Sequence, residues 1–400
     1  MLPRWLRALD QAREHKQPSQ RSRSFLPRLE GLEGRDLPAS LLASGLEAPT
    51  GSTVGPGGDL YVAEGGAGRI ARVNPRTGDV TTFASGLPVS PFVGFGVGAV
   101  DVAFLGRTAY VLVTLVGPDV GGTDVVGIYR VDGPNRFSVV ADIGAWSEAN
   151  PSASDIFVPT GSQYAMEPYR GGFLVTDGHH NRVLHVKLDG GITEVIAFDN
   201  IVPTGLEVRG NTVYMAQAGP VPHVPADGKV VSFRPRSATV REVASGSPLL
   251  VDVEFGRGNS LYALSQGDWE GTFEGDPAAP DTGALVRVNR NGTFTTVEDG
   301  LDRPSSLEFI GNTAYIVSLS GEVWRIDDVS GPPFGDGRRS VAGLFGDGRR
   351  SVAGLSTPPS SAGANGILRV VAMPDDQALS GLATDLLRAR TRRARHTSAR

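Results

Sequence analysis

The sequence predicts an all-β fold, a six-bladed β-propeller, from three observations. Glycine and proline are abundant, with 53 and 28 residues in 400, and no stretch has the composition of a helical protein. A frame of four short apolar runs separated by turns recurs, as in PTGLEVRGNTVYMAQ (Pro203–Gln217) and PSSLEFIGNTAYIVS (Pro304–Ser318). We count six copies at a period of roughly 40–60 residues, which suits a propeller blade of four strands.

The two ends of the repeat region are expected to close the ring together. LLASGL (Leu41–Leu46) matches the fourth-strand endings of other copies, yet it precedes the first full copy, and the last copy has no obvious fourth strand. Leu41–Ser44 is therefore expected to form the outer strand of the last blade and to remove a free sheet edge. The segment RRSVAGL on the C-terminal side is the competing closure.

The chain is expected to divide into four parts. Residues 1–39 form a disordered or sorting-type segment, and residues 40–330 form the propeller. Residues 331–365 form a low-complexity linker that carries FGDGRRSVAGL twice in tandem, and residues 366–400 form a basic tail. Both extensions are expected to be flexible.

Composition excludes several classes of function. The net charge of −5 gives no indication of nucleic-acid binding. Without cysteine there is no disulfide, no thiolate nucleophile and no Cys-ligated zinc. No window approaches the ~18 apolar residues of a membrane span, and the basic N-terminus lacks the apolar region of an ordinary signal peptide. A monomer is expected.

Longer stretches carry a family resemblance. PTGLEVRGNTVYMAQAGPVPHVPADGKVVSF, PLLVDVEFGRGNSLYALSQGD and GFLVTDGHHNRVLHV resemble the ScyD/ScyE family, six-bladed propellers related to the NHL and gluconolactonase-like propellers. The resemblance covers about Leu41 to Asp328. Separately, FLPRLEGLEGRDLPA (Phe25–Ala39) resembles the LExLExRxxPA segment of planctomycete surface and exported proteins. Together these resemblances imply an extracellular or cell-envelope location.

The resemblance also bears on catalysis. The gluconolactonase-like relatives are calcium- or zinc-dependent lactone hydrolases, with Asn and Asp ligands at the start of a blade's inner strand. The corresponding positions here are Thr50, Val100, Thr160, Thr204, Val251 and Ser305. Threonine, valine and serine are poor replacements for an amide or carboxylate ligand, which argues against the hydrolase hypothesis.

Two sets of aligned residues are expected at the mouth of the central channel. The second strands end at Glu64, Val113, Asp177, Gln217, Ser265 and Ser318. The third position of each inner strand is Gly51, Asp101, Gly161, Gly205, Asp252 and Ser306. The mouth would then be acidic, and Glu64, Asp101, Asp177 and Asp252 are candidate ligands for Ca²⁺, the cofactor that hard oxygen ligands suit. The alternative is that these carboxylates cap strand ends.

The adjacent histidines in VTDGHHNRVL (Val175–Leu184) raise the question of a catalytic or metal site. His179 and His180 are the catalytic candidates. However, the Asp, Gly and Asn residues of DGHHNR are also typical of turns. Adjacent side chains also point in different directions, so both histidines seldom bind one ion. We interpret the stretch as a turn.

The longest connections follow the second strands of three copies, and long loops on one face usually form a binding surface. We therefore expect ligand contacts from His223 and Trp269 in these loops, together with Glu64, Asp101, Asp177, Gln217 and Asp252 at the mouth.

Three hypotheses follow. The first is a secreted or envelope propeller that binds a small molecule or a protein partner on its loop face. The second is a metal-dependent lactone or ester hydrolase that uses His179 or His180 as general base. The third is a structural surface protein.

Overall fold

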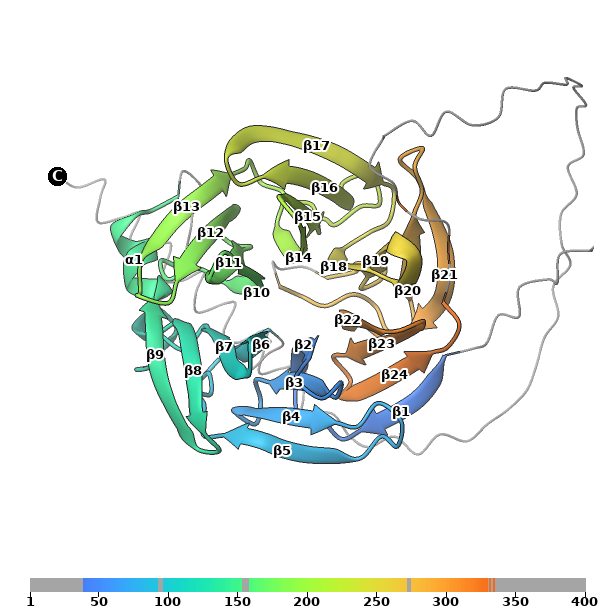
Figure 1. Cartoon of the computed structure of the whole chain (residues 1–400). Helices are drawn as coiled ribbons and strands as arrows, with labels where there is room; N and C mark the ends of the chain where they lie inside the picture. Colours follow the sequence, from blue (N-terminus) through green and yellow to red (C-terminus); the bar gives the residue numbers. More distant parts are fainter. Residues whose placement is uncertain are drawn as a thin grey trace, which may run out of the picture. The chain divides into compact units, whose positions relative to one another are not determined.

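The protein is described by a computed structural model over residues 39–92, 96–152, 158–271 and 275–329, together with 331 and 334. The predicted segments 1–39, 331–365 and 366–400 otherwise lie outside the described residues, as does the competing closure RRSVAGL. Six four-stranded antiparallel sheets are arranged in a ring as a six-bladed β-propeller (Figure 1), which confirms the predicted fold class.

Each of the first five blades is built from four consecutive strands. Blade 1 holds β2 (Pro49–Val54), β3 (Leu60–Glu64), β4 (Arg69–Val73) and β5 (Val80–Ser85). Blade 2 holds β6 (Gly98–Leu105), β7 (Thr108–Thr114), β8 (Gly127–Gly133) and β9 (Arg136–Asp142). Blade 3 holds β10 (Gln163–Tyr169), β11 (Gly172–Asp177), β12 (Arg182–Lys187) and β13 (Ile192–Ala197).

The next two blades follow the same order. Blade 4 holds β14 (Pro203–Arg209), β15 (Thr212–Gln217), β16 (Lys229–Arg234) and β17 (Ser237–Ser245). Blade 5 holds β18 (Leu250–Phe255), β19 (Leu261–Ser265), β20 (Gly283–Val288) and β21 (Phe294–Leu301). The first strands of neighbouring blades contact one another around the ring axis, so these six strands line the central channel.

Blade 6 closes the ring with strands from both ends of the repeat region. It holds β22 (Pro304–Ile310), β23 (Thr313–Ser318) and β24 (Glu322–Ile326), and β1 (Ser40–Ser44) is its outer strand. β1 runs antiparallel to β24, with Ala43 opposite Val323. The predicted N-terminal closure is therefore confirmed, and Figure 1 shows β1 beside β24.

Apolar patterning explains this arrangement. The second strands are buried almost throughout, and LYVAE in β3 is buried at every residue, because these strands lie between neighbouring blades. The outer strands, such as ITEVIA in β13, show a more exposed pattern because only one of their faces packs inward. Each interface between neighbouring blades holds its own apolar cluster among the described residues.

In the described residues one α-helix interrupts the all-β pattern, and it was not predicted. α1 (Ile143–Ala149) follows β9 and begins where the Asp142 side chain accepts a hydrogen bond of 2.8 Å from the Ala145 amide. Two short 3₁₀ turns, η2 (Pro118–Val120) and η3 (Arg257–Asn259), lie in connections. In the described part of the chain, no helix is long and apolar enough to cross a membrane.

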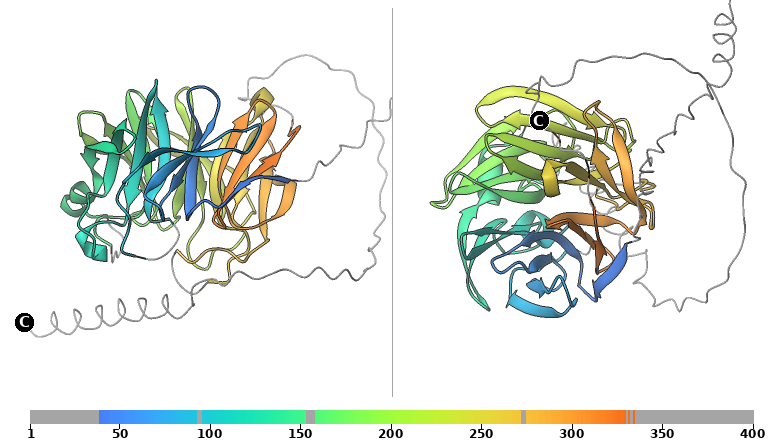
Figure 2. Two further views of the ribbon diagram at one scale, coloured as in Figure 1. Left: turned by 90° about the horizontal axis from the view of Figure 1, so that it is seen from below. Right: turned by 45° about the vertical axis from the view of Figure 1, so that its right-hand side comes forward.

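Antiparallel topology divides the connections between two faces of the ring. The turns that join first to second strands and third to fourth strands lie on one face. The connections from second to third strands, and those between blades, lie on the other, which we call the loop face. Figure 2 shows the strands in side view, running between these faces.

Candidate functional site

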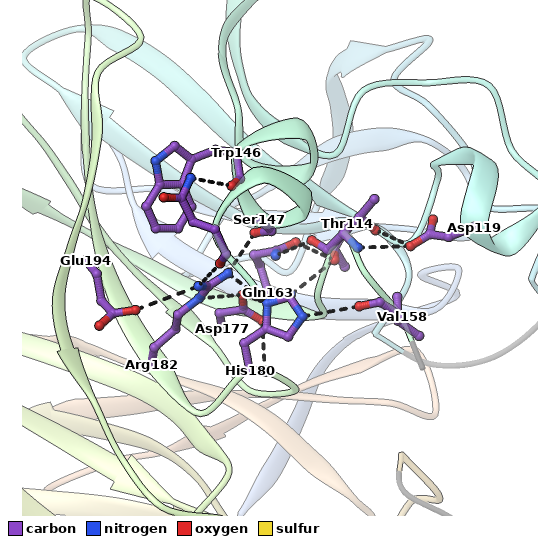
Figure 3. Close-up of polar contacts among 12 residues, drawn as sticks. Thr114, Asp119, Trp146, Ser147, Val158, Gln163, Asp177, His180, Arg182 and Glu194 are labelled. Atoms are coloured by element: carbon purple, nitrogen blue, oxygen red, sulfur yellow. Dashed lines mark hydrogen bonds and ion pairs between the residues drawn. The ribbon is translucent and has the colours of Figure 1, made fainter. Parts of the chain in front are cut away.

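The end of the second strand in blade 3 carries a buried polar network. Arg182 begins β12 directly opposite Asp177, and its side chain is only 1 % exposed. Its guanidinium donates to the Asn150 carbonyl oxygen (2.8 Å), to Ser147 Oγ (3.0 Å) and, at 3.4 Å, to Asp177 Oδ2. The same group lies 4.9 Å from the centre of the Trp146 ring in α1. Figure 3 labels both residues. The network therefore satisfies a buried cation from several sides, as burial of a charge requires.

His180 belongs to this network. Its Nε2 lies 3.2 Å from the Val158 carbonyl oxygen and must donate, because a carbonyl only accepts. Its Nδ1 lies 2.8 Å from both Asp177 Oδ2 and Arg182 Nη2, so it either donates to the carboxylate or accepts from the guanidinium. Both ring nitrogens of this buried histidine are thus engaged within the protein (Figure 3).

His179 is half-buried, and its ring lies 5.8 Å from that of His180, tilted by 44°. Nothing in this geometry aligns the two imidazoles on one ion. The structure therefore favours the turn interpretation of the histidine pair.

Glu64 occupies the equivalent place in blade 1 and is also neutralised. It lies opposite Arg69 across β3 and β4, and Arg69 binds it through Nε (2.6 Å) and Nη2 (2.9 Å). The Glu47 amide donates a third hydrogen bond of 2.7 Å. The sequence reasoning missed these arginines, although both follow their acidic partner by five residues. Glu64 and Asp177 are fully buried under their own turns and do not ring an open channel.

The remaining ends of the second strands are buried as well. Gln217 closes β15 opposite Pro203 and Lys229 and is 5 % exposed. Five of the six predicted strand ends are confirmed, and in blade 2 the strand runs one residue beyond Val113, to Thr114.

Asp101 and Asp252 join neighbouring blades. Asp101 accepts hydrogen bonds from its own neighbour Val102 (2.8 Å) and from Met166 in the next blade (2.7 Å). Asp252 repeats the arrangement with Val253 (2.8 Å) and Leu307 (2.7 Å). Burial raises the pKa of Asp101 to about 8 and that of Asp252 to about 7, although the backbone donors oppose the shift.

The positions aligned with the hydrolase ligands also make contacts between blades. Thr50 Oγ1 donates to the Val100 carbonyl oxygen (2.7 Å), and Thr204 Oγ1 donates to the Leu250 carbonyl oxygen (2.8 Å). Ser305 Oγ completes the series with a bond of 2.9 Å to the Thr50 carbonyl oxygen. These hydroxyls hold the inner strands together instead of presenting ligands to the channel.

The inner strand of blade 3 begins four residues later than the sequence alignment placed it. β10 begins at Gln163, which pairs with Asp177 as Pro203 pairs with Gln217. Thr160 therefore precedes the inner strand and donates to Asp119 Oδ2 (2.7 Å). Tyr164 and Ala165 occupy the two positions that the sequence reasoning gave to Thr160 and Gly161.

Tyr164 reaches across the channel. Its hydroxyl donates a long hydrogen bond of 3.4 Å to the Ser305 carbonyl oxygen in blade 6, on the opposite side of the ring. Burial, Asp252 and Asp101 all raise the pKa of this phenol, so it stays protonated. The tyrosine therefore obstructs the channel at the level of the two aspartates.

A set of axial glutamates was missed by the sequence reasoning. They share one position in four inner strands, two residues beyond the Asp252 position, and are Glu167, Glu207, Glu254 and Glu308. Burial and then the neighbouring carboxylates raise the pKa of Glu254 and Glu308. Glu207 shares a hydrogen bond with Glu254, and such a bond between two carboxyl groups needs a proton on one of them. The signal was available, since the glutamate recurs in LEV, LEF, VEF and MEP.

The four proposed metal ligands do not form a metal centre. Within the described residues, no group of three or more His, Asp or Glu side chains is placed to hold a metal ion. Glu64 and Asp177 each have a buried or half-buried arginine, while Asp101 and Asp252 are engaged by backbone amides.

The loop face brings together the two remaining predicted residues. His223, in the connection 218–228 of blade 4, lies edge-on to Trp269, in the connection 266–282 of blade 5, with ring centres 5.4 Å apart. The indole Nε1 donates to the Asp276 carbonyl oxygen (3.1 Å), and His223 Nδ1 donates to the Gly219 carbonyl oxygen (2.8 Å). His223 is buried, Trp269 is half-buried and the neighbouring Val224 is 40 % exposed.

Comparison with known proteins supports the fold. No known family model matches the chain, and no curated protein matches its sequence. Similar solved structures include a gluconolactonase from Xanthomonas campestris, with 14 % identity, a TM-score of 0.51, and coverage of 72 % of this chain and 89 % of that one. Another is the PQQ-bound aldose sugar dehydrogenase of Streptomyces coelicolor (14 %, TM-score 0.48, 72 % and 97 % covered).

Virginiamycin B lyase from Staphylococcus aureus is a third similar structure, with 12 % identity, a TM-score of 0.45, and coverage of 72 % of this chain and 98 % of that one. At these identities the likeness concerns the fold alone. The chain is a six-bladed β-propeller whose fold is similar to that of the Xanthomonas campestris gluconolactonase.

Proposed function

We propose that this protein is a binding module whose ligand rests on the loop face, against the platform formed by His223, Val224 and Trp269. The observation that carries the proposal is the contact between His223 and Trp269, because it joins the long connections of two neighbouring blades into one surface. An aromatic ring in a polar loop can stack on another ring or on the apolar face of a sugar.

In the blade 5 connection, the described residues 266–271 and 275–282 are tied down by hydrogen bonds before any ligand arrives. The Asp268 amide donates a hydrogen bond of 2.9 Å to Thr282 Oγ1, and the Asp268 carbonyl oxygen accepts one of 2.8 Å from the Ala279 amide. Gln266 Oε1 accepts a further bond of 2.9 Å from the Ala278 amide. A loop ordered in this way loses less conformational entropy on binding, which favours affinity.

The channel supports a scaffold role better than a catalytic one. Tyr164 obstructs it, and the acidic residues expected at its mouth are engaged within and between blades. We therefore place binding on the loops and rank catalysis in the channel below it.

The finer features of this proposal rest on resemblance. The repeat frames suggest a ScyD/ScyE-like propeller, and residues 25–39 suggest export to the envelope or the exterior. We propose a monomer there that binds a ring-bearing small molecule, with a neutral oligosaccharide as the first class to test.

Intrinsic tryptophan fluorescence tests the proposal with cello-, malto- and chito-oligosaccharides as probes. Binding of one of them should change the emission, and Trp269→Ala should weaken binding by roughly tenfold, as loss of a stacking contact does. Trp324→Phe, in β24 of blade 6, is the matched control and should bind as the wild type does. Equal binding by wild type and Trp269→Ala would refute the proposed platform, and no binding by any probe would favour the structural surface protein.

A metal-dependent lactone or ester hydrolase is the second candidate. One observation favours it: Asp252, Glu207 and Glu254 lie close enough to influence one another's ionisation, and a cation would relieve that repulsion. We rank it second because Tyr164 obstructs the channel and each mouth carboxylate already has partners.

A further inference from the structure

A basic pocket lies on the face opposite the loop face. It is an open depression of about 180 Å³ between blades 3 and 4, lined by Tyr169, Arg170, Asn211, Arg234, Pro235 and Arg236. Its walls come from the β10–β11, β14–β15 and β16–β17 turns, so neighbouring blades build it jointly. Since one water molecule occupies about 30 Å³ in the liquid, the pocket has room for a tetrahedral anion.

Among the described residues, the three arginines of this pocket have no acidic partner. Arg170 Nη2 donates to Asn211 Oδ1 (3.1 Å), and its guanidinium lies 5.2 Å from the centre of the Tyr169 ring. Among the residues that the structure describes, no carboxylate lies within ion-pair distance of Arg170, Arg234 or Arg236. In a chain with a net charge of −5, three guanidinium groups around one pocket, without a carboxylate partner among the described residues, leave a local excess of positive charge.

Arg170 also departs from the turn chemistry of the other blades. Its backbone adopts φ 48°, in the left-handed region that side chains disfavour. The first residue of the equivalent two-residue turn is a glycine in blades 2, 4 and 6, namely Gly106, Gly210 and Gly311, each with positive φ. Glycine would therefore fit this turn at least as well. The arginine costs about 1 kcal/mol of backbone strain. The backbone of this turn thus gives no reason for an arginine at position 170, which points to a role for its side chain.

We propose that this pocket binds the oxyanion of a phosphate or sulfate monoester. Guanidinium groups donate paired N–H bonds that match the oxygens of such an anion. The Arg170–Asn211 bond fixes one donor across the blade boundary, and Arg234 and Arg236 face it from the β16–β17 turn. This site is independent of the loop-face platform.

Isothermal titration of the full chain with phenyl phosphate and phenyl sulfate tests the site. We expect one or both to bind, and the stronger of the two identifies the ester class. Arg170→Gly should weaken binding by roughly tenfold or more, since a charge-assisted hydrogen bond is lost. The same variant should keep or raise the melting temperature, because glycine suits the turn.

Arg107→Ala is the matched control, since Arg107 lies in the equivalent turn of blade 2. Wild-type affinity in this control, together with a loss in Arg170→Gly and Arg236→Ala, supports a built site. Three results would each overturn it: no binding of either ester, unchanged binding by Arg170→Gly, or an equal loss in Arg107→Ala.

Discussion

Tyr164 and Ser305 lie in opposite blades, and the tyrosine hydroxyl crosses the ring axis to donate a hydrogen bond of 3.4 Å to the serine carbonyl oxygen. The contact links residues 141 positions apart and obstructs the channel between Asp101 and Asp252. The axis of this propeller is thus lined by carboxyl groups and crossed by the Tyr164 side chain. A binding surface is therefore expected on the loops and not in the channel.

Two substitutions at Tyr164 separate its hydrogen bond from its bulk. Tyr164→Phe should lower the free energy of unfolding by only about 1 kcal/mol, because the bond is long and one neutral hydrogen bond contributes little. Tyr164→Ala should lower it by about 3 kcal/mol or more, because the ring is also lost from the channel. Urea unfolding measures both, and equal values would show that the ring does not fill the channel.

The axial carboxyl groups make stability depend on pH. A carboxyl whose pKa is raised by folding binds its proton more tightly in the folded protein than in the unfolded chain. The free energy of unfolding should therefore fall as pH rises from about 4, the unfolded pKa, to the folded values of about 7 for Asp252 and about 8 for Asp101. Each such proton contributes a slope of at most about 1.4 kcal/mol per pH unit.

Glu254→Gln tests the source of this slope, because an amide imitates the protonated acid. Between pH 5 and 8, roughly the interval in which the raised groups ionise, the variant should lose stability less steeply than the wild type. Glu242→Gln is the control, since Lys229 lowers the pKa of Glu242. Urea unfolding at several pH values measures the slopes, and a wild type whose stability rises steadily over this interval would contradict the account.

The buried Arg182 predicts a large and asymmetric mutational effect. Arg182→Ala should cost about 3–5 kcal/mol, because it leaves the Asp177 carboxylate buried without its cation. The double variant Asp177→Asn/Arg182→Met should recover part of that loss. Arg69→Ala is the comparison, and it should cost less because Arg69 is 28 % exposed and water can reach the site. Equal losses for the two arginines by urea unfolding would refute this distinction.

The repeat frame was readable from sequence because turn residues and apolar runs recur at fixed spacing, and even the closing strand β1 could be assigned from LLASGL. Side-chain partnerships were harder. Glu64 and Asp177 looked like free carboxylates, since a strand alignment does not show which cross-strand residue will neutralise them. Blade 3 was set four residues out of register, because PTG at 159–161 imitates the start of an inner strand.

The axial glutamates escaped notice for a related reason. A glutamate within a strand is normally predicted to face the solvent. Only the closure of the ring places this face of the inner strands toward the axis. The helix α1 was missed because seven residues give too short a periodic pattern to distinguish from a loop.

Truncation tests the closure of the ring. Removal of residues 1–38 should leave the melting temperature nearly unchanged. Removal through Leu46 should lower stability by about 3 kcal/mol or more, since it exposes the β24 edge and loses the burial of Ala43 and Leu46. Thermal melts of the two truncated chains compare them directly, and equal melting temperatures would contradict the role of β1.

The most direct measurement of the central claim is a thermal melt with millimolar Ca²⁺, Mg²⁺ or Zn²⁺, beside a sample with chelator. A metal that binds only the folded state would stabilise it by about 2.7 kcal/mol at a hundredfold excess over its dissociation constant. We predict no shift for the wild type or for Asp252→Asn, because the mouth carboxylates are already engaged and Tyr164 obstructs the channel. A rise in the wild type that Asp252→Asn abolishes would contradict the account and favour the metal-dependent hydrolase.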